Sequence, residues 1–531
     1  MPFAYDVIVI GSGFGGAVTA CRLAESGKKV LILERGRRWK PTEYPRAAGD
    51  AWIYNPSKPH LQNGWLDYRN FGDMGVVMGA GVGGGSLIYA NVFVEAKPEL
   101  FDNGWPPEIT YAELRPYYDK VGSMLSVQKI PDTQLTHRLQ LMREGAAKLG
   151  YSERFDKLPL AVSFDEDWHY GLEDPFNDKH SKPHLNVHGQ QQGTCVHCGN
   201  CDIGCQVQAK NTLDLNYIPV AEKHGAEVRP LHLVRTIEPE GTGYRVRFDR
   251  IEDGKLIPGS ETAQRVIVAA GSVGSTELLL RCRDQYKTLP NLSARLGYNW
   301  SSNGDFLTPA FYKDRKPYPT QGPTITARID FLDGSVDGQR FFIEDGGFPN
   351  VLRNFLTAKE QNRTKNPILS ALYSELSELL HPDDPLGNVM PWFAQGIDAA
   401  NGQLYLGRPW WAFWRAKELQ MRWEIERSVP VIEAIISMHK RLSQVTGGDP
   451  WVPPTWTLFK NLITPHPLGG CNMASTAADG PVDHRGEVFN YPRLYVADGA
   501  IIPEAIGLNP SRTIAAVAER IARLILDEEG S

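Results

Sequence analysis

The sequence of 531 residues lacks several features that mark specialised classes of protein. No apolar run approaches the roughly 20 residues that a membrane-spanning helix needs, which argues against an integral membrane protein. No basic block is present and the formal net charge is −6, so nucleic acid is not an expected partner. Internal repeats and low-complexity segments are also absent, which argues against a repeat protein or a disordered chain.

Cysteine is scarce, with seven residues, and Met1 leads almost directly into an apolar run at Tyr5, with no room for a signal peptide. Both features favour a cytoplasmic protein whose cysteines are mostly reduced. The remaining composition, 42% hydrophobic and 22% charged, is that of an ordinary globular protein. A chain of this length is expected to form two domains.

The first 34 residues carry a complete dinucleotide-binding pattern. An apolar strand, a glycine-rich loop, a helix and a second strand are predicted in that order at residues 5–10, 11–16, 17–26 and 29–33. Gly11 permits the tight turn after the strand, Gly13 lets a pyrophosphate approach the backbone, and Gly16 lets helix and strand pack closely. Glu34 follows the second strand, where a carboxylate accepts hydrogen bonds from a ribose. The alternative is a glycine-rich turn without a ligand, but the complete order favours phosphates at the helix N-terminus.

A second glycine-rich loop spans Gly79 to Asn91, with five glycines in its first seven residues. Such a run forms neither a stable helix nor a stable strand, and it lets the backbone press against a flat or anionic ligand. A flexible linker is the alternative. The apolar residues on both sides argue against it, because linkers are polar.

Alternation of strands and helices stops after Gly36 and resumes later in the chain. Helices are predicted at residues 112–125, 136–149, 213–223 and 275–281, and strands at 227–235, 244–249 and 264–269. Between residues 306 and 459 we expect antiparallel strands at 322–331, 340–344, 389–398 and 403–406, with helices at 367–380 and 428–445. A last strand after Leu494 and a helix at 511–526 return to the first domain.

Five separated motifs follow one another along nearly the whole chain. They are Gly11–Gly16, Gly81–Ser86, Ala269–Ser275, His466–Gly470, and Asp498-Gly499 followed by Asn509-Pro510. Together they resemble the glucose–methanol–choline (GMC) oxidoreductases, and within them the cholesterol oxidase branch. The resemblance implies an α/β fold, with a discontinuous Rossmann-type FAD-binding domain and a second α+β substrate domain that contains a largely antiparallel sheet. It also implies FAD rather than a nicotinamide dinucleotide.

The resemblance also implies which residues contact FAD. Glu34 would hold the adenosine ribose, Val234 would offer its backbone to the adenine, and Asp498-Gly499 would reach the ribityl chain. The full predicted set is Gly11, Ser12, Gly13, Phe14, Gly15, Gly16, Glu34, Arg35, Gly79, Gly81, Gly83, Gly84, Gly85, Ser86, Tyr89, Asn91, Val234, Ala270, Gly271, Asp498, Gly499 and Asn509.

The domain prediction follows from the interrupted pattern. The FAD-binding domain takes residues 1–95 (with the flavin-contact loop 79–91), 213–300 and 465–531, the last with the catalytic histidine. The substrate domain takes residues 96–212, which include a cysteine-rich loop at 195–205, and residues 301–464.

His466 is the first catalytic candidate. Pro465 and Pro467 flank it and fix the backbone, and an imidazole exchanges a proton near neutral pH. The alternative is a histidine that caps a turn. The resemblance pairs His466 with Asn509 to position and deprotonate an alcohol while hydride leaves its carbon for flavin N5.

Glu344 is the second candidate, because it follows three large apolar residues. Burial in an apolar cavity would raise its pKa and suit it to moving a proton. A strand-end carboxylate in solvent is the alternative, and Asp345 competes for the role. The resemblance implies a glutamate in a comparable strand that shifts a steroid double bond.

A cysteine-rich window has the spacing C-x2-C-x2-C-x3-C, formed by Cys195, Cys198, Cys201 and Cys205. Bacterial ferredoxins share this spacing, although Gln206 stands where a proline is expected. An iron–sulfur cluster, a zinc or disulfide site, and reduced thiols all remain open. Some cytochrome-linked sugar dehydrogenases carry a cluster near this position, whereas secreted sterol oxidases lack these cysteines.

The sequence therefore predicts an FAD-dependent enzyme that oxidises an alcohol, with a secondary hydroxyl on a sterol or similar apolar molecule as substrate and O₂ or a redox carrier as acceptor. A dehydrogenase of another alcohol or sugar that passes electrons through a cluster is the first alternative. A flavin-binding protein without turnover is the second, but His466 and Asn509 would not be needed there. The apolar run from Arg408 to Arg415 is a candidate peripheral membrane contact, with a buried pocket wall as its alternative.

Overall fold

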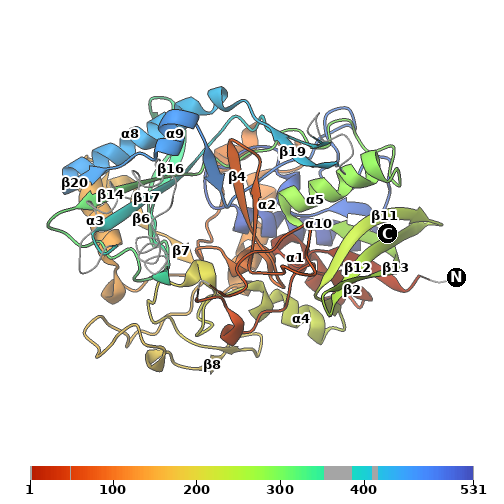
Figure 1. Ribbon diagram of the computed structural model, residues 1–531, viewed down its shortest axis with the longest axis horizontal. Helices are drawn as coiled ribbons and strands as arrows, with labels where there is room; N and C mark the ends of the chain where they lie inside the picture. The colour runs from red at the N-terminus through yellow and green to blue at the C-terminus, as the bar shows by residue number, and fades with distance from the viewer. Residues whose placement is uncertain (1–2, 48, 352–385, 409–416, 530–531) are drawn as a thin grey trace.

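Two sheets organise the structure, a computed structural model. It describes residues 3–47, 49–351, 386–408 and 417–529. A seven-stranded sheet and a six-stranded sheet occupy opposite ends of the molecule, and both termini lie at the end of the larger sheet (Figure 1). The chain crosses between the two sheets several times.

The seven-stranded sheet has the order β10-β2-β1-β13-β12-β11, with β22 paired to β13 as well. Its strands are β1 (Tyr5–Ile10), β2 (Val30–Leu33), β10 (Glu227–Arg229), β11 (His232–Glu240), β12 (Gly243–Glu252), β13 (Lys255–Val268) and β22 (Leu494–Val496). The pairs among β10, β2, β1, β13 and β22 are parallel, whereas β11 to β13 form an antiparallel meander. This sheet therefore combines a Rossmann-type core with an antiparallel extension.

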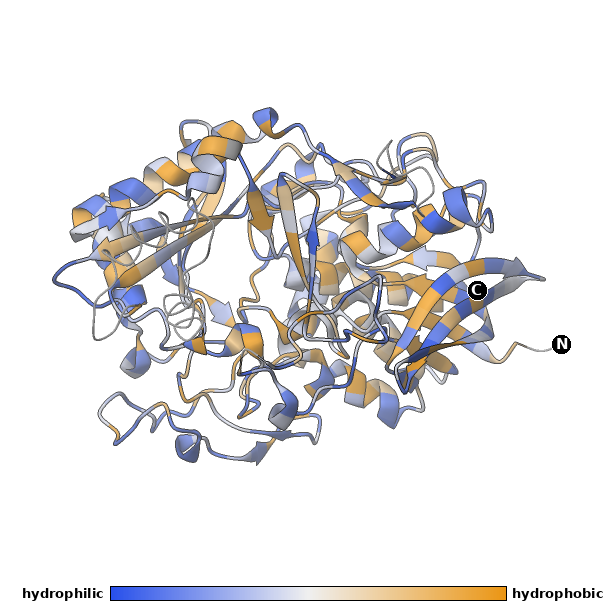
Figure 2. Cartoon of the chain, viewed as in Figure 1, coloured by the Kyte–Doolittle hydropathy of each residue, from blue (hydrophilic) through white to orange (hydrophobic). Residues whose placement is uncertain are grey.

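Helices cover this parallel core, which buries apolar residues on both of its faces. Helix α1 (Phe14–Glu25) begins directly after the first glycine-rich loop, and it packs against α4 (Tyr217–Lys223) and α10 (Ser511–Glu529). Four of the six residues of β1 are apolar and nearly inaccessible to solvent, as expected for a parallel strand covered on both sides. Figure 2 shows apolar residues along these strands.

The six-stranded sheet has the order β20-β14-β17-β16-β15-β6, and every pair in it is antiparallel. Its strands are β6 (Phe155–Lys157), β14 (Phe306–Tyr312), β15 (Ala327–Val336), β16 (Gln339–Asp345), β17 (Val389–Gly396) and β20 (Gly448–Pro450). Helices α3 (His137–Lys148) and α8 (Val429–Thr446) pack against it. This is the largely antiparallel sheet that the sequence predicts for the second domain.

A three-stranded sheet lies between the two large ones. It has the order β21-β4-β3, with bounds β3 (Leu66–Asn70), β4 (Met74–Gly79) and β21 (Leu462–Thr464). The remaining elements are α2 (Tyr111–Met124), β5 (Gln128–Lys129), β7 (Pro159–Leu160), β8 (His184–Leu185), β9 (Gln191–Gln192), α5 (Gly271–Leu280), β18 (Gln403–Gly407), β19 (Glu418–Arg422) and α9 (Pro454–Phe459). Because β21 pairs with β4, the chain just before His466 runs beside the strand that enters the second glycine-rich loop.

The structure departs from the predicted elements in a few places. A single helix over residues 213–223 is wrong, because Asn216 has a non-helical backbone that separates a short 3₁₀ turn from α4. After Gly36, where no further strand is expected before the second glycine-rich loop, the chain forms β3 and β4. The helix predicted at 367–380 lies outside the described residues. Among the described helices, none has the length and apolar character needed to cross a bilayer.

Candidate active site

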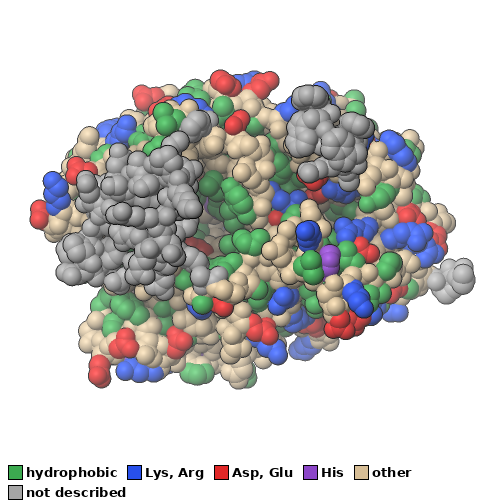
Figure 3. Space-filling view, in the orientation of Figure 1, with side chains coloured by type: hydrophobic (Ala, Val, Ile, Leu, Met, Phe, Trp, Pro, Cys, Tyr) green, Lys and Arg blue, Asp and Glu red, His purple; other side chains and the backbone are tan. Residues whose placement is uncertain are grey.

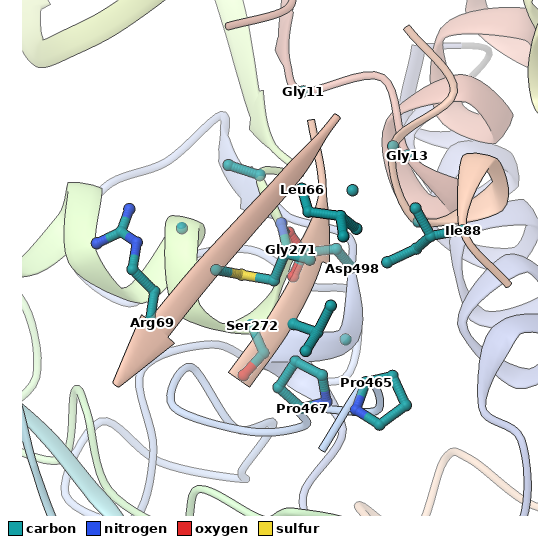
Figure 4. Close-up of a pocket in the computed structure, with 18 of the residues that line it drawn as sticks. Gly11, Gly13, Leu66, Arg69, Ile88, Gly271, Ser272, Pro465, Pro467 and Asp498 are labelled. Carbon is teal, nitrogen blue, oxygen red and sulfur yellow. The ribbon is translucent and has the colours of Figure 1, made fainter. Parts of the chain in front are cut away.

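One cavity of about 1010 Å³ runs between the sheets. Gly11, Gly13 and Glu34 line one end, and His466 and Asn509 line the other. Figure 4 shows Gly11 and Gly13 at one end of this space and Pro465 and Pro467 at the other, with Asp498 and Gly271 between them. The space therefore joins the predicted dinucleotide site to the predicted catalytic residues.

The first loop has glycines where other backbone comes too close for a side chain. A Cβ atom at Gly11 would lie 2.3 Å from the carbonyl oxygen of Ala269, and its φ of +99° also favours glycine. At Gly16 a Cβ would lie 2.0 Å from the oxygen of Gly11, as the predicted close packing of helix and strand requires. A Cβ at Gly13 would meet no protein atom closer than 3.9 Å and would enter the cavity instead.

The carboxylate of Glu34 is almost inaccessible to solvent, at 5% exposure, and is fixed on both oxygens. Its Oε2 accepts hydrogen bonds from the backbone N–H of Ser12 at 3.1 Å and from the Ser12 hydroxyl at 2.7 Å, and Oε1 accepts one from Gly36 N–H at 2.8 Å. Ser12 of the first loop thus orients this acid at the cavity wall.

The second glycine-rich loop touches the first. A Cβ at Gly84 would lie 2.6 Å from the Cα of Gly13, so the two loops come this close only because residue 84 is glycine. Gly85 faces open space at the cavity wall. Ser12 joins the loops, because its Oγ accepts a hydrogen bond from Gly83 N–H at 3.1 Å.

Asp498 lines the cavity between its two ends. Its Oδ2 accepts hydrogen bonds from Gly271 N–H at 2.7 Å and Ser275 Oγ at 2.5 Å, and its Oδ1 accepts one from Ala500 N–H at 2.8 Å. Burial raises the pKa of this carboxyl group. Asp498 therefore ties the start of α5 to the segment that leads to Asn509.

The predicted cofactor residues divide into two groups. Those that line the cavity are Gly11, Ser12, Gly13, Phe14, Gly15, Glu34, Arg35, Gly79, Gly84, Gly85, Tyr89, Val234, Ala270, Gly271, Asp498, Gly499 and Asn509. The others, Gly16, Gly81, Gly83, Ser86 and Asn91, are not part of its wall. They support the loops instead: Ser86 Oγ, for example, donates a hydrogen bond to Gly83 O at 2.7 Å. Gly15 belongs to the first group, and it also packs against the carbonyl oxygen of Ala497.

His466 meets a carboxylate that the sequence analysis did not single out. Its Nδ1 lies 2.9 and 3.0 Å from the two oxygens of Asp305, which is fully buried just before β14. Burial pulls the pKa of His466 down, but the adjacent Asp305 outweighs it and raises the pKa overall. No sequence pattern links these two residues, which are 161 positions apart.

Glu344 and Asp345 are both buried, but they face opposite sides of β16. Glu344 Oε2 accepts a hydrogen bond from Gln395 at 2.8 Å. A hydrogen bond with the Asn509 side chain and the charge of His466 both lower the pKa of Glu344. Burial raises the pKa of Glu344 to about 8. Asp345 instead accepts hydrogen bonds from the backbone N–H groups of Thr326 and Ala327, at 2.6 and 2.7 Å.

Asn509 completes the cluster at this end. It lines the cavity and is 5% exposed. Its side chain hydrogen-bonds Glu344, and its Oδ1 has no hydrogen-bond partner among the described residues. Asn509 and His466 therefore lie at the cavity wall with Glu344 behind them, and an amide oxygen and an imidazole are available to a polar ligand.

The cysteine-rich loop lies beside the cavity without forming a metal site. In the described part of the chain, no three His, Cys, Asp or Glu side chains are grouped so that they could hold a metal ion. The four sulfurs are free thiols with separate local contacts, such as Asn91 Nδ2 donating to Cys201 Sγ at 3.2 Å. Burial raises the pKa values of Cys195, Cys198 and Cys205, and neighbouring thiols of the loop raise them further. The described residues thus give the predicted cluster no support, and it stays a prediction.

The chain matches two protein-family models. Residues 431–518 match the GMC oxidoreductase model, and residues 9–39 match a model described as an NAD(P)-binding Rossmann-like domain. A cholesterol oxidase from Mycobacterium tuberculosis (strain H37Rv) is 31% identical over 98% of this chain and 91% of its own length. The chain belongs to the GMC oxidoreductase family.

Other relatives of this GMC oxidoreductase agree with that assignment. A cholesterol oxidase from Acinetobacter baumannii is 29% identical over 98% of this chain and 94% of its own length. The solved structure of pyridoxine 4-oxidase from Mesorbium loti superposes with a TM-score of 0.64 over 98% of this chain and 99% of the other, at 16% identity. The protein is thus a cholesterol oxidase-like enzyme of a family that oxidises alcohols.

The family implies FAD, and the cavity of this GMC oxidoreductase has the shape and chemistry to hold it. Cβ atoms at Gly13 and Gly85 would enter the cavity rather than touch protein, which leaves room for a pyrophosphate beside the start of α1. Glu34 presents a fixed carboxylate near that end. The cavity is long enough to extend from these groups to His466.

Proposed function

We propose that this enzyme oxidises a secondary hydroxyl group on a sterol or similarly apolar alcohol to a carbonyl. The observation that carries this proposal is the apolar wall at the catalytic end of the cavity. Leu307, Ile325 and Phe393 line it, and the Phe393 ring centroid lies 6.2 Å from that of His466. Figure 3 shows hydrophobic side chains gathered in the middle of the face of the molecule that it presents. A sugar would leave most of its hydroxyl groups unpaired against such a wall.

The proposed catalytic residues have separate tasks. His466 takes the proton of the hydroxyl group, and Asn509 orients that hydroxyl through its side-chain amide. Glu344, whose pKa burial raises to about 8, in its carboxylate form takes a proton from one carbon of the steroid and returns it to another, which shifts a double bond. FAD, when bound, accepts the hydride from the substrate carbon. The predicted cofactor residues and the division into FAD-binding and substrate domains are part of this proposal.

The substrate is tested by anaerobic bleaching of the flavin absorbance. A sterol with a 3β-hydroxyl group should reduce the flavin, and the matched 3-ketosteroid, which lacks the hydroxyl, should not. Glucose and ethanol provide polar and small alcohols for comparison. We expect the sterol to give the highest kcat/KM. A higher value for glucose or ethanol would contradict the sterol assignment while leaving alcohol oxidation intact.

We propose O₂ as the electron acceptor. The two relatives described above are named oxidases, and the thiols of the cysteine-rich loop do not form a metal-holding group. The alternative is a dehydrogenase that uses an iron–sulfur cluster. The contact between Cys201 and Asn91, next to the cavity, is the one observation that favours it. Oxygen consumption equal to carbonyl formation, together with iron analysis, decides between them.

A further inference from the structure

Asp305 meets His466 in a closed arrangement in which the carboxylate is fully buried and the imidazole is 17% exposed. Both carboxylate oxygens lie within 3.0 Å of His466 Nδ1, and Thr464 Oγ1 lies 2.5 Å from Oδ2. The backbone N–H of His466 donates to the same Thr464 hydroxyl at 2.8 Å. Asp305 has none of its side chain exposed, so water does not compete for its oxygens.

We propose that Asp305 is a positioning residue that keeps the proton of neutral His466 on Nδ1 and leaves Nε2 unprotonated toward the substrate hydroxyl. An ionised carboxylate can only accept hydrogen bonds, so the ring nitrogen that faces it must be the donor. The remaining ring nitrogen then carries the lone pair. This inference rests on the proposed function of His466 as the base.

The proton transfer that follows is balanced without any further reactant. The O–H bond of the alcohol breaks, its electron pair stays on oxygen, and the proton forms a bond to Nε2. His466 becomes an imidazolium whose positive charge lies beside the negative charge of Asp305. Because Asp305 is fully buried and most of the His466 side chain is shielded from solvent, this attraction is stronger than it would be in water.

The loop that carries Asp305 also holds the second catalytic residue. Asn303 donates from Nδ2 to Leu508 O at 2.9 Å and accepts from Ile506 and Gly507 N–H at 3.0 and 2.9 Å. Its neighbours are fixed from behind by Asp398, which accepts hydrogen bonds from Ser302 N–H and Oγ, both at 2.9 Å. One loop therefore sets the position of His466 and of the chain that presents Asn509.

Protonation of His466 can be measured without turnover. In protein labelled with ¹⁵N in histidine only, the His466 signals are identified by their loss in His466→Gln. Above the pKa of the ring, we expect a protonated Nδ1 and an unprotonated Nε2. A protonated Nε2 in the neutral ring would overturn the proposal. This measurement uses the wild-type chain, so it stands even if variants at Asp305 fail to fold.

The pH dependence of kcat gives the second test. Asp305 and Glu344 are the titratable groups that act on His466, and Asp305 has the larger effect in raising its pKa. A base must be deprotonated, so kcat rises with pH through that pKa. In Asp305→Asn the pKa of His466 falls, so we expect the acid limb to move to lower pH. The plateau should fall at least about tenfold, which is less than the roughly 10²–10⁴-fold that the base itself contributes.

Asp398→Asn is the matched control, because it removes a buried carboxylate that holds the same loop but has no hydrogen bond to His466. It should lower the thermal midpoint and leave the acid limb in place. An unmoved limb in Asp305→Asn, with normal flavin content, would overturn the inference. His466→Gln separates the proposed function from the role of Asp305. If this variant keeps full turnover, the proposed function itself fails. If it loses turnover while Asp305→Asn is unaffected, only the role of Asp305 is rejected.

Discussion

His466 is the residue on which the chemistry depends most directly. Because it lines the cavity away from the predicted phosphate-binding end, its removal should not affect cofactor retention. We expect His466→Ala to keep its flavin and to lose about 10²–10⁴-fold in kcat, the usual contribution of a general base. Flavin content by absorbance and kcat with an alcohol substrate are the two measurements. Unchanged kcat would return this histidine to a structural role.

Glu344 can be separated from the oxidation step. In Glu344→Gln the amide keeps the shape and hydrogen bonding of the side chain but cannot carry a proton between two carbons. With a 5-ene sterol we expect nearly normal oxidation and loss of the conjugated product, measured as the ultraviolet absorbance of an enone. If the variant still forms the conjugated ketone at the wild-type rate, another group shifts the double bond.

The same carboxyl group links stability to pH. Its pKa is about 8 in the folded protein and near 4.5 in the unfolded chain, so the folded state binds the extra proton between these values. Stability from this group is fully present below pH 4.5 and is lost as the pH rises toward 8, by at most about 1.4 kcal/mol per pH unit. The thermal midpoint of wild type minus that of Glu344→Gln should therefore fall from pH 5 to pH 8. A flat difference would show that Glu344 is not buried as a neutral acid.

Single residues were predictable where the chain surrounds them with a local pattern. The prolines beside His466 and the apolar run before Glu344 are such patterns. Alternation along β16 puts Glu344 and Asp345 on opposite faces, but only the structure shows that Glu344 is the one beside His466. No local pattern marks Asp305, because its contact with His466 forms only when the fold brings β14 and β21 together. The sequence also could not tell whether the cysteine spacing would gather the four sulfurs around one point.

At the scale of elements, the β1–loop–α1 unit is the part that the sequence predicts best. Strand β1 begins and ends as expected, because a short apolar run followed by glycines has few alternative structures. Strand β14 is not predicted from the sequence, because Pro309 lies in its middle and proline cannot donate a hydrogen bond to a sheet. Its pairing with β17 and β20 is fixed by partners far away in the chain.

Gly13 in that unit offers a clean test of cofactor binding. Its φ of −73° is allowed for any residue, so Gly13→Val should not strain the backbone. Its side chain would instead enter the cavity where the phosphates are proposed to lie, and we expect protein without flavin absorbance. Gly49→Val is the control, because this exposed glycine has no neighbour within 4 Å and should keep its flavin. Normal flavin in Gly13→Val would remove the loop from the cofactor site.

At the scale of the whole molecule, the two sheets are built from alternating stretches of one chain, and their shared cavity exists only when all of them are in place. The strands of the seven-stranded sheet come from residues 5–33, 227–268 and 494–496. The cysteine-rich loop lies in the chain between the first two stretches, and Asp202 and Ile203 of that loop line the cavity. A change in this loop could therefore affect the flavin even without a metal.

The double variant Cys198→Ser/Cys201→Ser distinguishes these roles. If the thiols only pack the loop, protein purified without oxygen should contain flavin but no iron. The variant should then keep the wild-type spectrum and the wild-type rate of flavin reduction by substrate. Replacing sulfur by oxygen removes the Asn91 contact to Cys201 Sγ but keeps a hydrogen-bonding atom there, so the loop should stay folded. Iron in the wild-type protein, with broad absorbance that the variant loses, would establish the cluster and make a redox carrier the expected acceptor.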